Sequence, residues 1–292
     1  MNNKLLHDKD TNVVFLSPCL NTKKYGNPVF YKDLMTILKD MGIETRELKC
    51  TRDYWARDYM PIQLGENEFL KYRYYPDYLV KSKNKKDIET ITDATKVLRG
   101  MGINCRSTNL IIDGGNMVPC GPYIVMTDKV FSENRKKKDD WEFKALLDSE
   151  LGHPVIIIPW TSHEDDVYGH SDGFIKWCGD NRILMGNHGD CYPEEAASIR
   201  RILESYGFEV TEMRFKDKVD TPCCDLNWAY INFLQVGKNI IMPKFDIDED
   251  AIALQYIQTA FPNCNIRQIE MKEIAKEGGA LHCISWNVYL PK

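Results

Sequence analysis

Apolar residues recur with the period of a helix in five stretches of the chain, and a short strand-like segment follows each stretch. In the first, Leu34, Ile37, Leu38 and Met41 have the spacing i, i+3, i+4, i+7, which places them on one helix face. We expect a helix near 32–41 that stops at Gly42, followed by a strand in IETREL. The other four predicted helices carry Ala94, Val97, Leu98 and Met101; Leu146, Leu147 and Leu151; Ile199, Ile202, Leu203 and Tyr206; and Leu254, Ile257 and Phe261.

The five units are evenly spaced. Their helix stops at residues 42, 102, 152, 207 and 262 are 60, 50, 55 and 55 residues apart. The strands expected after the last four stops are INCRS, PVIII, FEVTEM and NIRQIE. A second strand region also recurs, and in the first four cases a central turn makes it a predicted hairpin. These regions read PIQLGENEFLKYR, NMVPCGPYIVMTD, FIKWCGDNRILMGN, INFLQVGKNIIMP and, lastly, ISWNVYL.

The last region has one strand where the others have two. The N-terminal segment NVVFLSP can supply the missing partner, so we expect 13–16 to pair with 285–289. This pairing would close the array and remove its free edges. The pattern thus predicts an α/β fold, a five-bladed pseudo-symmetric propeller of ββαβ units in one domain over 1–292. The alternative is an ordinary α/β sheet whose units look alike by chance.

Composition changes this picture little. The 292 residues are 43% hydrophobic with a net charge of -5, which is ordinary for a globular protein. The acidic balance argues against nucleic acid and suits a small cationic substrate. We expect no signal peptide and no membrane span. None of the ten cysteines forms a CxxC pair, so we expect free thiols and a cytoplasmic protein. The oligomeric state stays open, with a homodimer as one option.

Candidate chemistry lies where each second strand region begins, because equivalent positions of a ring meet at its centre. There the units read WARDYMP, IIDGGNM, YGHSDGF, NWAYINF and LHCISW. A thiol, a histidine and carboxylates brought together suit covalent catalysis. Taken singly, each has an alternative: a DGGN turn, a core histidine or a buried inert cysteine. The candidates are Asp58, Asp113, His170, Asp172, Asn227 or Asn232, and Cys283.

WARDYMP, IDGGNM, HSDGF and GGALHC resemble, in order, the four motifs of the agmatine deiminase family, which includes the bacterial peptidyl-arginine deiminases. The resemblance extends from about Asn12 to Leu290 and implies the same five-bladed propeller. It also implies hydrolysis of a guanidino group to a ureido group and ammonia, with agmatine as the expected substrate. No metal or organic cofactor is implied.

The resemblance implies a role for each matching residue. Cys283 would be the nucleophile, His170 the general acid/base, and Asp113 and Asp172 the carboxylates that hold the guanidinium. Substrate contacts are expected from Asp58, Trp55, Asn116 and Gly279. The chain has Asp113 where the family usually has Glu, and Ala280 where it often has Gly.

Other functions remain open at this point. The same fold serves peptidyl-arginine and free-arginine deiminases and amidinotransferases, and a non-catalytic binding propeller is an alternative of another class. A zinc site at His282 and Cys283 is disfavoured by the adjacency of the two residues. His282 would point away from Cys283 in a strand, so we interpret it as structural. The polar residues 163–166 suit a solvated connection or a lid.

Overall fold

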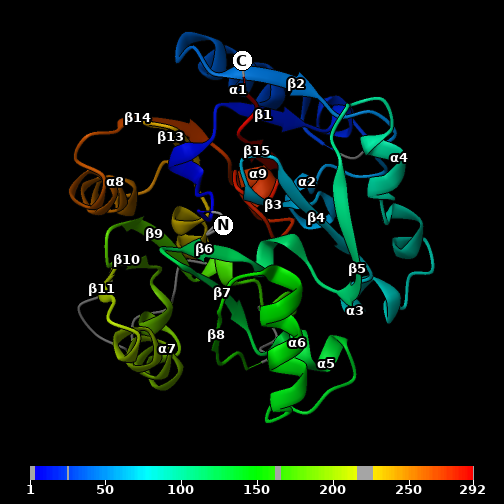
Figure 1. Cartoon of the computed structure of the whole chain (residues 1–292). Helices are drawn as coiled ribbons and strands as arrows, with labels where there is room; N and C mark the ends of the chain where they lie inside the picture. Colours follow the sequence, from blue (N-terminus) through cyan, green and yellow to red (C-terminus); the bar gives the residue numbers. More distant parts are fainter. Residues whose placement is uncertain (1–3, 25, 162–165, 216–225, 292) are drawn as a thin grey trace.

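Five small mixed sheets make up the architecture. The computed structural model describes residues 4–24, 26–161, 166–215 and 226–291. Each sheet has three strands: an antiparallel pair and a third strand parallel to one member of that pair. In Figure 1 the sheets surround the centre of the molecule, and the longer helices lie outside them. The sheets are β15-β1-β2 (Ser285–Val288, Val13–Leu16, Glu44–Glu47), β3-β4-β5 (Ile62–Gly65, Glu68–Arg73, Cys105–Ile111), β6-β7-β8 (Val118–Cys120, Tyr123–Thr127, Val155–Ile158), β9-β10-β11 (Ile175–Gly179, Arg182–Met185, Glu209–Glu212) and β12-β13-β14 (Leu234–Val236, Asn239–Lys244, Asn265–Glu270).

The predicted pairing of the two ends of the chain is confirmed. β1 runs antiparallel to β15, with Val13 opposite Val288 and Leu16 opposite Ser285. On its other edge β1 runs parallel to β2. The four predicted hairpins are also present, each followed in its sheet by the strand that comes after the helix. The repeat found in the sequence is therefore a repeat of three-stranded sheets.

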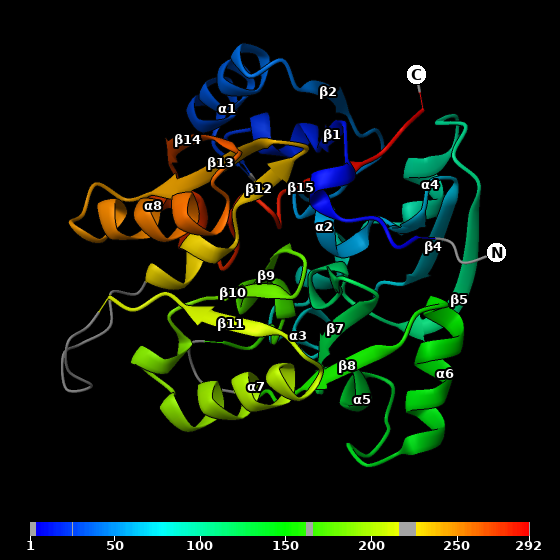
Figure 2. The same cartoon turned by 60° about the vertical axis from the view of Figure 1, so that its left-hand side comes forward.

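The helices agree with the pattern except at their ends. α1 begins at Pro28, earlier than predicted, because the Asn27 side chain caps the Val29 and Phe30 amides and proline suits the first turn. α4 ends at Leu98, so Met101 lies outside it, since Arg99 is already extended. Figure 2 shows α1, α6, α7 and α8 lying over the sheets. The helices are α1 (Pro28–Asp40), α2 (Ala56–Tyr59), α3 (Asp77–Val80), α4 (Ala94–Leu98), α5 (Lys129–Glu133), α6 (Trp141–Leu151), α7 (Pro193–Ser205), α8 (Glu249–Ala260) and α9 (Lys272–Ala275).

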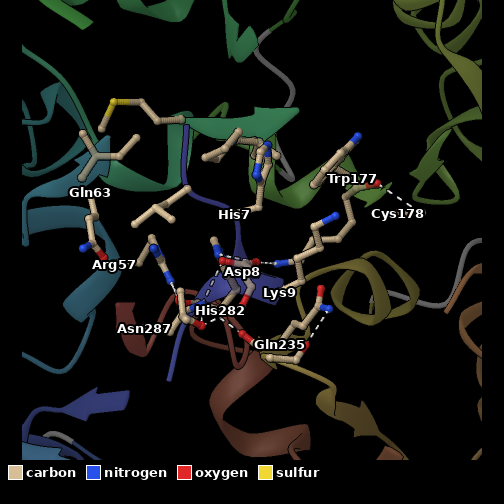
Figure 3. A pocket seen from close by; sticks show the side chains of 18 of the residues that line it. His7, Asp8, Lys9, Arg57, Gln63, Trp177, Cys178, Gln235, His282 and Asn287 are labelled. Carbon is tan, nitrogen blue, oxygen red and sulfur yellow. Dashed lines mark hydrogen bonds and ion pairs between the residues drawn. The ribbon is translucent and has the colours of Figure 1, made fainter. Parts of the chain in front are cut away.

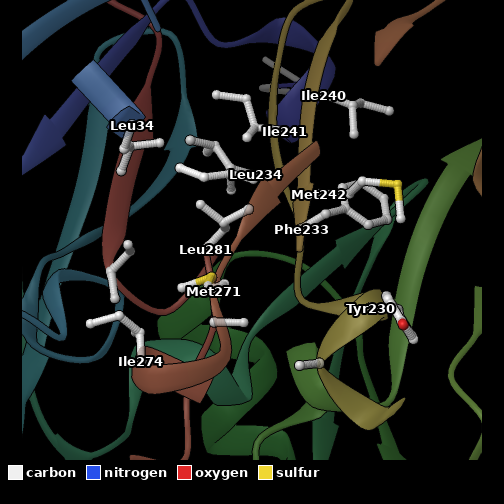
Figure 4. Close-up of a cluster of buried hydrophobic side chains, with 14 of the residues drawn as sticks. Leu34, Tyr230, Phe233, Leu234, Ile240, Ile241, Met242, Met271, Ile274 and Leu281 are labelled. Carbon is white, nitrogen blue, oxygen red and sulfur yellow. The ribbon is translucent and has the colours of Figure 1, made fainter. Parts of the chain in front are cut away.

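The largest hydrophobic cluster anchors the segment that carries Cys283. Figure 4 shows Leu34 of α1, Ile240 and Ile241 of β13, and Leu281 contributing to this cluster. Leu281 and Ile284, on either side of His282 and Cys283, are fully buried. Burying such side chains stabilises the fold by about 1.5–3 kcal/mol each. The thiol is thus held on a packed segment rather than on a free loop.

Two sequence expectations concern the whole chain. Among the described residues, none of the helices combines the length and apolar character needed to cross a membrane. Of the described cysteines, seven have free thiols, Cys283 among them. Cys191, however, is disulfide-bonded, so the expectation that every thiol is free is wrong at that position. Cys223 and Cys224 lie outside the described residues.

Candidate active site

The site is built from a short helical turn that precedes each hairpin. α2 precedes β3, and the 3-10 turns η4 (Gly114–Asn116), η5 (Ser171–Gly173) and η7 (Asn227–Ile231) precede β6, β9 and β12. These turns lie next to one another, α2 against η4, η4 against η5, and η5 against η7. Asp113 and His170 occupy the same position, the cap of their turn. The sequence repeat thus brings its candidate residues together.

His170 lies between two carboxylates. Its Nε2 is 3.0 Å from Asp113 Oδ2 and its Nδ1 is 3.6 Å from Asp58 Oδ1. Burial alone would lower the pKa of this imidazole, but Asp58 and Asp113 outweigh burial and raise the pKa to about 9. His170 is therefore an imidazolium at neutral pH and can donate a proton. Burial raises the pKa of Asp58 to about 7, helped by Asp113 and Asp172 and opposed by His170.

Gly115 allows this arrangement. Its amide donates to Asp58 Oδ1 at 3.1 Å. A Cβ at this position would lie 2.7 Å from His170 Nδ1 and 2.9 Å from Asp58 Oδ1, which is closer than real Cβ atoms approach other groups. Gly115, the second glycine of the IDGGNM motif, is thus required by the packing of His170 and Asp58, and not only by a turn.

Cys283 lies beside Asp172 and is almost completely buried. Its Sγ is 3.8 Å from Asp172 Oδ2, and its amide donates to Asn232 Oδ1 at 3.2 Å. Burial, and then the negative charges of Asp172 and Asp58, raise the pKa of the thiol well above its usual value. In the unliganded site the group is therefore a thiol rather than a thiolate.

His282 and Cys283 precede β15, which begins at Ser285, so the expectation that they point to opposite faces of a strand is wrong: both side chains contact Asp172 Oδ2. His282 supports this carboxylate. Its Nδ1 lies 2.6 Å from Asp172 Oδ2. Burial, Arg57 and Lys176 lower the pKa of His282 to about 4, so the imidazole is neutral and donates a hydrogen bond. Burial would raise the pKa of Asp172, but the hydrogen bond from His282 and the positive charges of His170 and Arg57 together outweigh burial and keep this pKa below its usual value. This bonding agrees with the structural interpretation of His282.

Two carboxylate oxygens of the site are left without partners. Asp113 Oδ1 and Asp172 Oδ1 are buried and accept no hydrogen bond from the described residues. The other oxygen of each carboxylate is taken, by His170 and by His282 respectively. Buried polar atoms are almost always hydrogen-bonded. The two Oδ1 atoms are therefore acceptors suited to a ligand with several N–H donors.

Aromatic side chains pack around the segment before Cys283. A Cβ on Gly279 would lie 2.2 Å from Trp55 Cζ3, and one on Gly278 would lie 2.6 Å from the Tyr168 hydroxyl. Trp55 and Tyr168 are both half-buried, whereas His170 is buried. The expectation that Trp55 and Gly279 adjoin the site is consistent with these contacts.

The two amide side chains differ in what they touch. Asn116 Oδ1 accepts from the Thr127 amide at 2.7 Å and the Ser171 amide at 3.4 Å. This bonding holds η4 against η5, and the substrate contact expected of Asn116 stays a prediction. Asn232 is the amide that reaches Cys283. Asn227 is also buried, with its Oδ1 lacking a partner among the described residues.

Sequence reasoning missed Lys129 and Tyr78. Lys129 is buried, and its Nζ donates to the carbonyls of Val167 and Tyr168 at 3.0 and 2.6 Å. The same ammonium lies 4.7 Å from the ring of Tyr78, which is 6.1 Å from the His170 ring. Lys129 thus fixes the segment that leads into His170. Neither residue belongs to a repeated motif, so no pattern could have singled them out.

Two further expectations concern a metal site and the polar residues 163–166. Within the described ranges, no three His, Cys, Asp or Glu side chains gather in a way that could hold a metal ion. His163, Glu164 and Asp165 of the expected polar loop lie outside the described residues. Asp166 is described, and it accepts from the amides of Tyr168 and Gly169 and from the Trp160 indole. Asp166 thus acts as a local turn residue.

Known structures share this fold. The chain is similar to an agmatine deiminase of C. jejuni, with a TM-score of 0.76 at 18% identity over 98% of this chain and 96% of the other. It is also similar to an amidinotransferase from Microseira wollei, with a TM-score of 0.58 at 15% identity over 99% and 97% of the two chains. At these identities the likeness concerns the fold alone.

Curated sequences give closer matches over part of the chain. An agmatine deiminase of Pseudomonas aeruginosa (strain LESB58) is 37% identical over 218 residues, which are 64% of this chain and 59% of that protein. An agmatine deiminase of Ectopseudomonas mendocina is 25% identical over 212 residues, 62% of this chain. The matched region spans 57% of the length of that second protein.

The family assignment rests on a longer match. Residues 27–288 match the Porphyromonas-type peptidyl-arginine deiminase family. This range contains the four short motifs, Cys283, and every strand of the five sheets except β1. The chain belongs to the Porphyromonas-type peptidyl-arginine deiminase family.

Proposed function

We propose that this protein is a deiminase that hydrolyses a guanidino group to a ureido group and ammonia, with agmatine as its substrate and N-carbamoylputrescine as its product. The observation that carries the proposal is the pair of unpartnered oxygens, Asp113 Oδ1 and Asp172 Oδ1, beside a cysteine thiol. A guanidinium is planar and cationic and offers several N–H donors. It is the ligand class that two buried carboxylates bind best.

Binding of the guanidinium would prepare the nucleophile. After burial, the carboxylate that raises the pKa of Cys283 most is Asp172, which is also one of the two carboxylates that a cationic substrate would neutralise. A bound cation next to the sulfur lowers the free energy of the thiolate relative to the thiol. Loss of the thiol proton to solvent would then leave Cys283 as the attacking thiolate, with Asp113 and Asp172 fixing the guanidinium carbon near it.

His170 would donate a proton when ammonia leaves and accept a proton when water attacks. Attack of the thiolate on the guanidinium carbon gives a neutral tetrahedral adduct, and the imidazolium of His170 protonates one nitrogen. Ammonia leaves, and the carbon remains on Cys283 as an S-alkylthiouronium cation. Neutral His170 then takes a proton from water as the water oxygen attacks this carbon. Collapse releases the ureido product and the Cys283 thiol. Acid–base help of this kind contributes about 10²–10⁴-fold.

The charges around the aromatic side chains favour a substrate with a cationic tail. Glu277 and Asp166 are among the carboxylates that raise the pKa of Tyr168, after burial, and Glu277 acts likewise on Tyr54. Trp55 and Tyr168 are half-buried and pack against the two glycines before Cys283, so we expect a substrate chain to leave past them. Agmatine ends in an ammonium, whereas free arginine would bring a carboxylate to this acidic region. Trp55, Asp58 and Gly279 would shape the pocket around the substrate.

We also propose that the five sheets are the blades of a closed propeller in a single domain. The pairing of β1 with β15 and the contacts among α2, η4, η5 and η7 support this arrangement. Closure matters for function because Asp58, Asp113, His170 and Cys283 come from different units. In a closed propeller the arrangement of the units would bring these residues together, and no long connecting loop would be needed.

An ammonia-release assay tests the function. Agmatine, free arginine, an arginine-containing peptide and methylated arginines should be compared, with agmatine expected to give the highest kcat/KM. Cys283→Ser should abolish turnover and keep the fold, judged by circular dichroism. Intact-mass analysis of quenched wild-type reactions should show the adduct on Cys283. Ammonia release from none of these compounds, or near-normal turnover by the Ser variant, would refute the proposal.

A further inference from the structure

A cavity lies against His282. It has a volume of about 340 Å³, and none of Cys283, His170, Asp113 and Asp172 lines it. Figure 3 shows the cavity between the N-terminal segment, which supplies His7, and β9, which supplies Trp177. The deiminase chemistry described above makes no use of this space.

The cavity is basic, although the whole chain is acidic. Among the described residues, five lysine or arginine side chains line it and a single carboxylate, Asp8, whereas the chain has a net charge of -5. The carboxylate is already engaged, because Asp8 Oδ2 lies 2.5 Å from Lys176 Nζ. The cavity therefore carries an excess of positive charge. The basic residues are Lys9, Arg57, Lys176, Arg182 and Lys238.

Three of these cations are available to a ligand. Lys9 Nζ lies 4.4 Å from the ring centre of Trp177, and Arg182 donates to the Cys178 carbonyl at 3.3 Å. Within the described part of the chain, Lys9, Arg182 and Lys238 form no ion pair with a carboxylate. The His7 and Trp177 rings, whose centres are 3.9 Å apart, form an aromatic wall. Cations beside such a wall suit an anion that carries a small organic body.

We propose that this cavity is a second ligand site, which binds a small anion bearing a carboxylate or a phosphate group. Lys9 and Arg182 would contact the anionic group, and the His7–Trp177 wall would hold the rest of the ligand. The volume admits a small molecule rather than a peptide or a nucleic acid.

The proposed site is connected to Cys283 by a chain of charged and polar contacts. Lys176 contacts Asp8, and Asp8 Oδ2 lies 3.6 Å from His282 Nε2. His282 Nδ1 lies 2.6 Å from Asp172 Oδ2, which is 3.8 Å from Cys283 Sγ. His282 is therefore a positioning residue that faces the cavity with one nitrogen and the candidate active site with the other.

Anion binding in the cavity should change how strongly Asp172 binds a guanidinium. Burial, Arg57 and Lys176 keep His282 neutral. An anion near Lys176 offsets part of this positive charge, so His282 would bear more positive charge and hold Asp172 more tightly. Less negative charge is then left for a guanidinium. On the basis of the proposed deiminase function, the anion should raise KM for the guanidine about fivefold or more. By thermodynamic linkage a bound guanidine must weaken anion binding by the factor by which the anion raises the Kd of the guanidine.

Binding is measured first, without turnover. Inorganic phosphate and succinate, in separate titrations of the full chain, should each be followed by calorimetry and by tryptophan fluorescence. Binding of succinate alone assigns a carboxylate ligand, and binding of phosphate alone assigns a phosphate ligand. Lys9→Met together with Arg182→Gln should weaken binding about tenfold or more. Lys4→Met is the matched control, since Lys4 lies on the same segment outside the cavity, and it should bind like wild type.

The outcomes separate the two proposals. No binding of either anion, or equal binding by the double variant with wild-type circular dichroism and Tm, overturns the second site. Binding with an unchanged KM supports the site and overturns its connection through His282. If no guanidine is turned over, the deiminase proposal fails, whereas the titrations still decide whether the cavity binds anions.

Discussion

Two buried histidines of this protein have the same kind of neighbours and opposite protonation. His170 lies between Asp113 and Asp58, and His282 lies between Asp172 and Asp8. Yet the pKa of His170 is raised to about 9, whereas that of His282 is lowered to about 4. A histidine between two carboxylates is thus not by itself a proton donor.

The two pKa values differ because the cations near each histidine differ. Arg57 and Lys176 both act against a charge on His282, and Lys176 also neutralises Asp8 at 2.5 Å. Near His170 the charge of Lys129 has a weaker effect than those of Asp58 and Asp113. The same pair of residue types therefore gives a general acid in one place and a neutral hydrogen-bond donor in the other.

The largest expected contrast is between the two histidines themselves. His170→Asn removes the proton donor and should lower kcat about 10³-fold, within the range for general acid–base catalysis. His282→Asn keeps an N–H near the position of Nδ1, so Asp172 stays hydrogen-bonded and kcat should stay within about tenfold of wild type. Ammonia release at saturating agmatine measures both. Equal losses in the two variants would mean that His170 is only a positioning residue.

A second contrast concerns the carboxylates that face the substrate. Asp113→Asn replaces an acceptor by a group that also donates, and it removes one charge that a guanidinium would meet. Removing one member of a buried charged pair commonly costs about 2–5 kcal/mol, so kcat/KM should fall about 10²-fold or more. Asp180→Asn, in the turn between β9 and β10, is the control and should change little. Similar behaviour of both variants would make Asp113 a turn residue.

The sequence predicted those features of the site and the fold that follow from the repeated units. Equivalent positions in successive units led to Asp58, Asp113, His170 and Cys283, and the structure places Asp113 and His170 at equivalent caps. The pairing of β1 with β15 followed from the same argument. A repeat is informative because each unit must bury a similar surface, so its pattern survives differences in individual residues.

What the sequence could not show is which side chains of different segments meet. Asp8 and Lys176 are far apart in the chain and no spacing relates them, yet Lys176 pairs with Asp8, and Asp8 in turn contacts His282. The early start of α1 depended on the cap by Asn27, which a search for apolar periodicity does not detect. Protonation was also beyond reach, because it depends on burial and on the sum of charges from several units.

The pH profile tests the acidic character of His170. Deprotonation of the imidazolium should lower kcat/KM for agmatine above pH about 9, and protonation of Asp58 should lower it below pH about 7. In Asp58→Asn the main charge that favours the imidazolium is lost, so the alkaline limb should move to lower pH. Asp8→Asn, next to the other histidine, should leave that limb in place. An alkaline limb unmoved by Asp58→Asn would contradict the assignment of this limb to His170.

The smallest effect on rate, and the clearest on stability, belongs to His282. A histidine whose pKa is about 4 when folded and ordinary when unfolded binds fewer protons in the folded state between those values. Unfolding therefore takes up a proton as the pH falls, and stability is lost between pH about 6.5 and about 4. The full difference corresponds to about 3 kcal/mol. His282→Asn removes this contribution, so its unfolding free energy should fall less steeply with acid than that of wild type. Urea titrations from pH 7 to 4 measure the two slopes, and His188→Asn, at a histidine away from both sites, is the control. Parallel slopes for wild type and His282→Asn would mean that His282 is charged when folded, and the two histidines would then no longer differ.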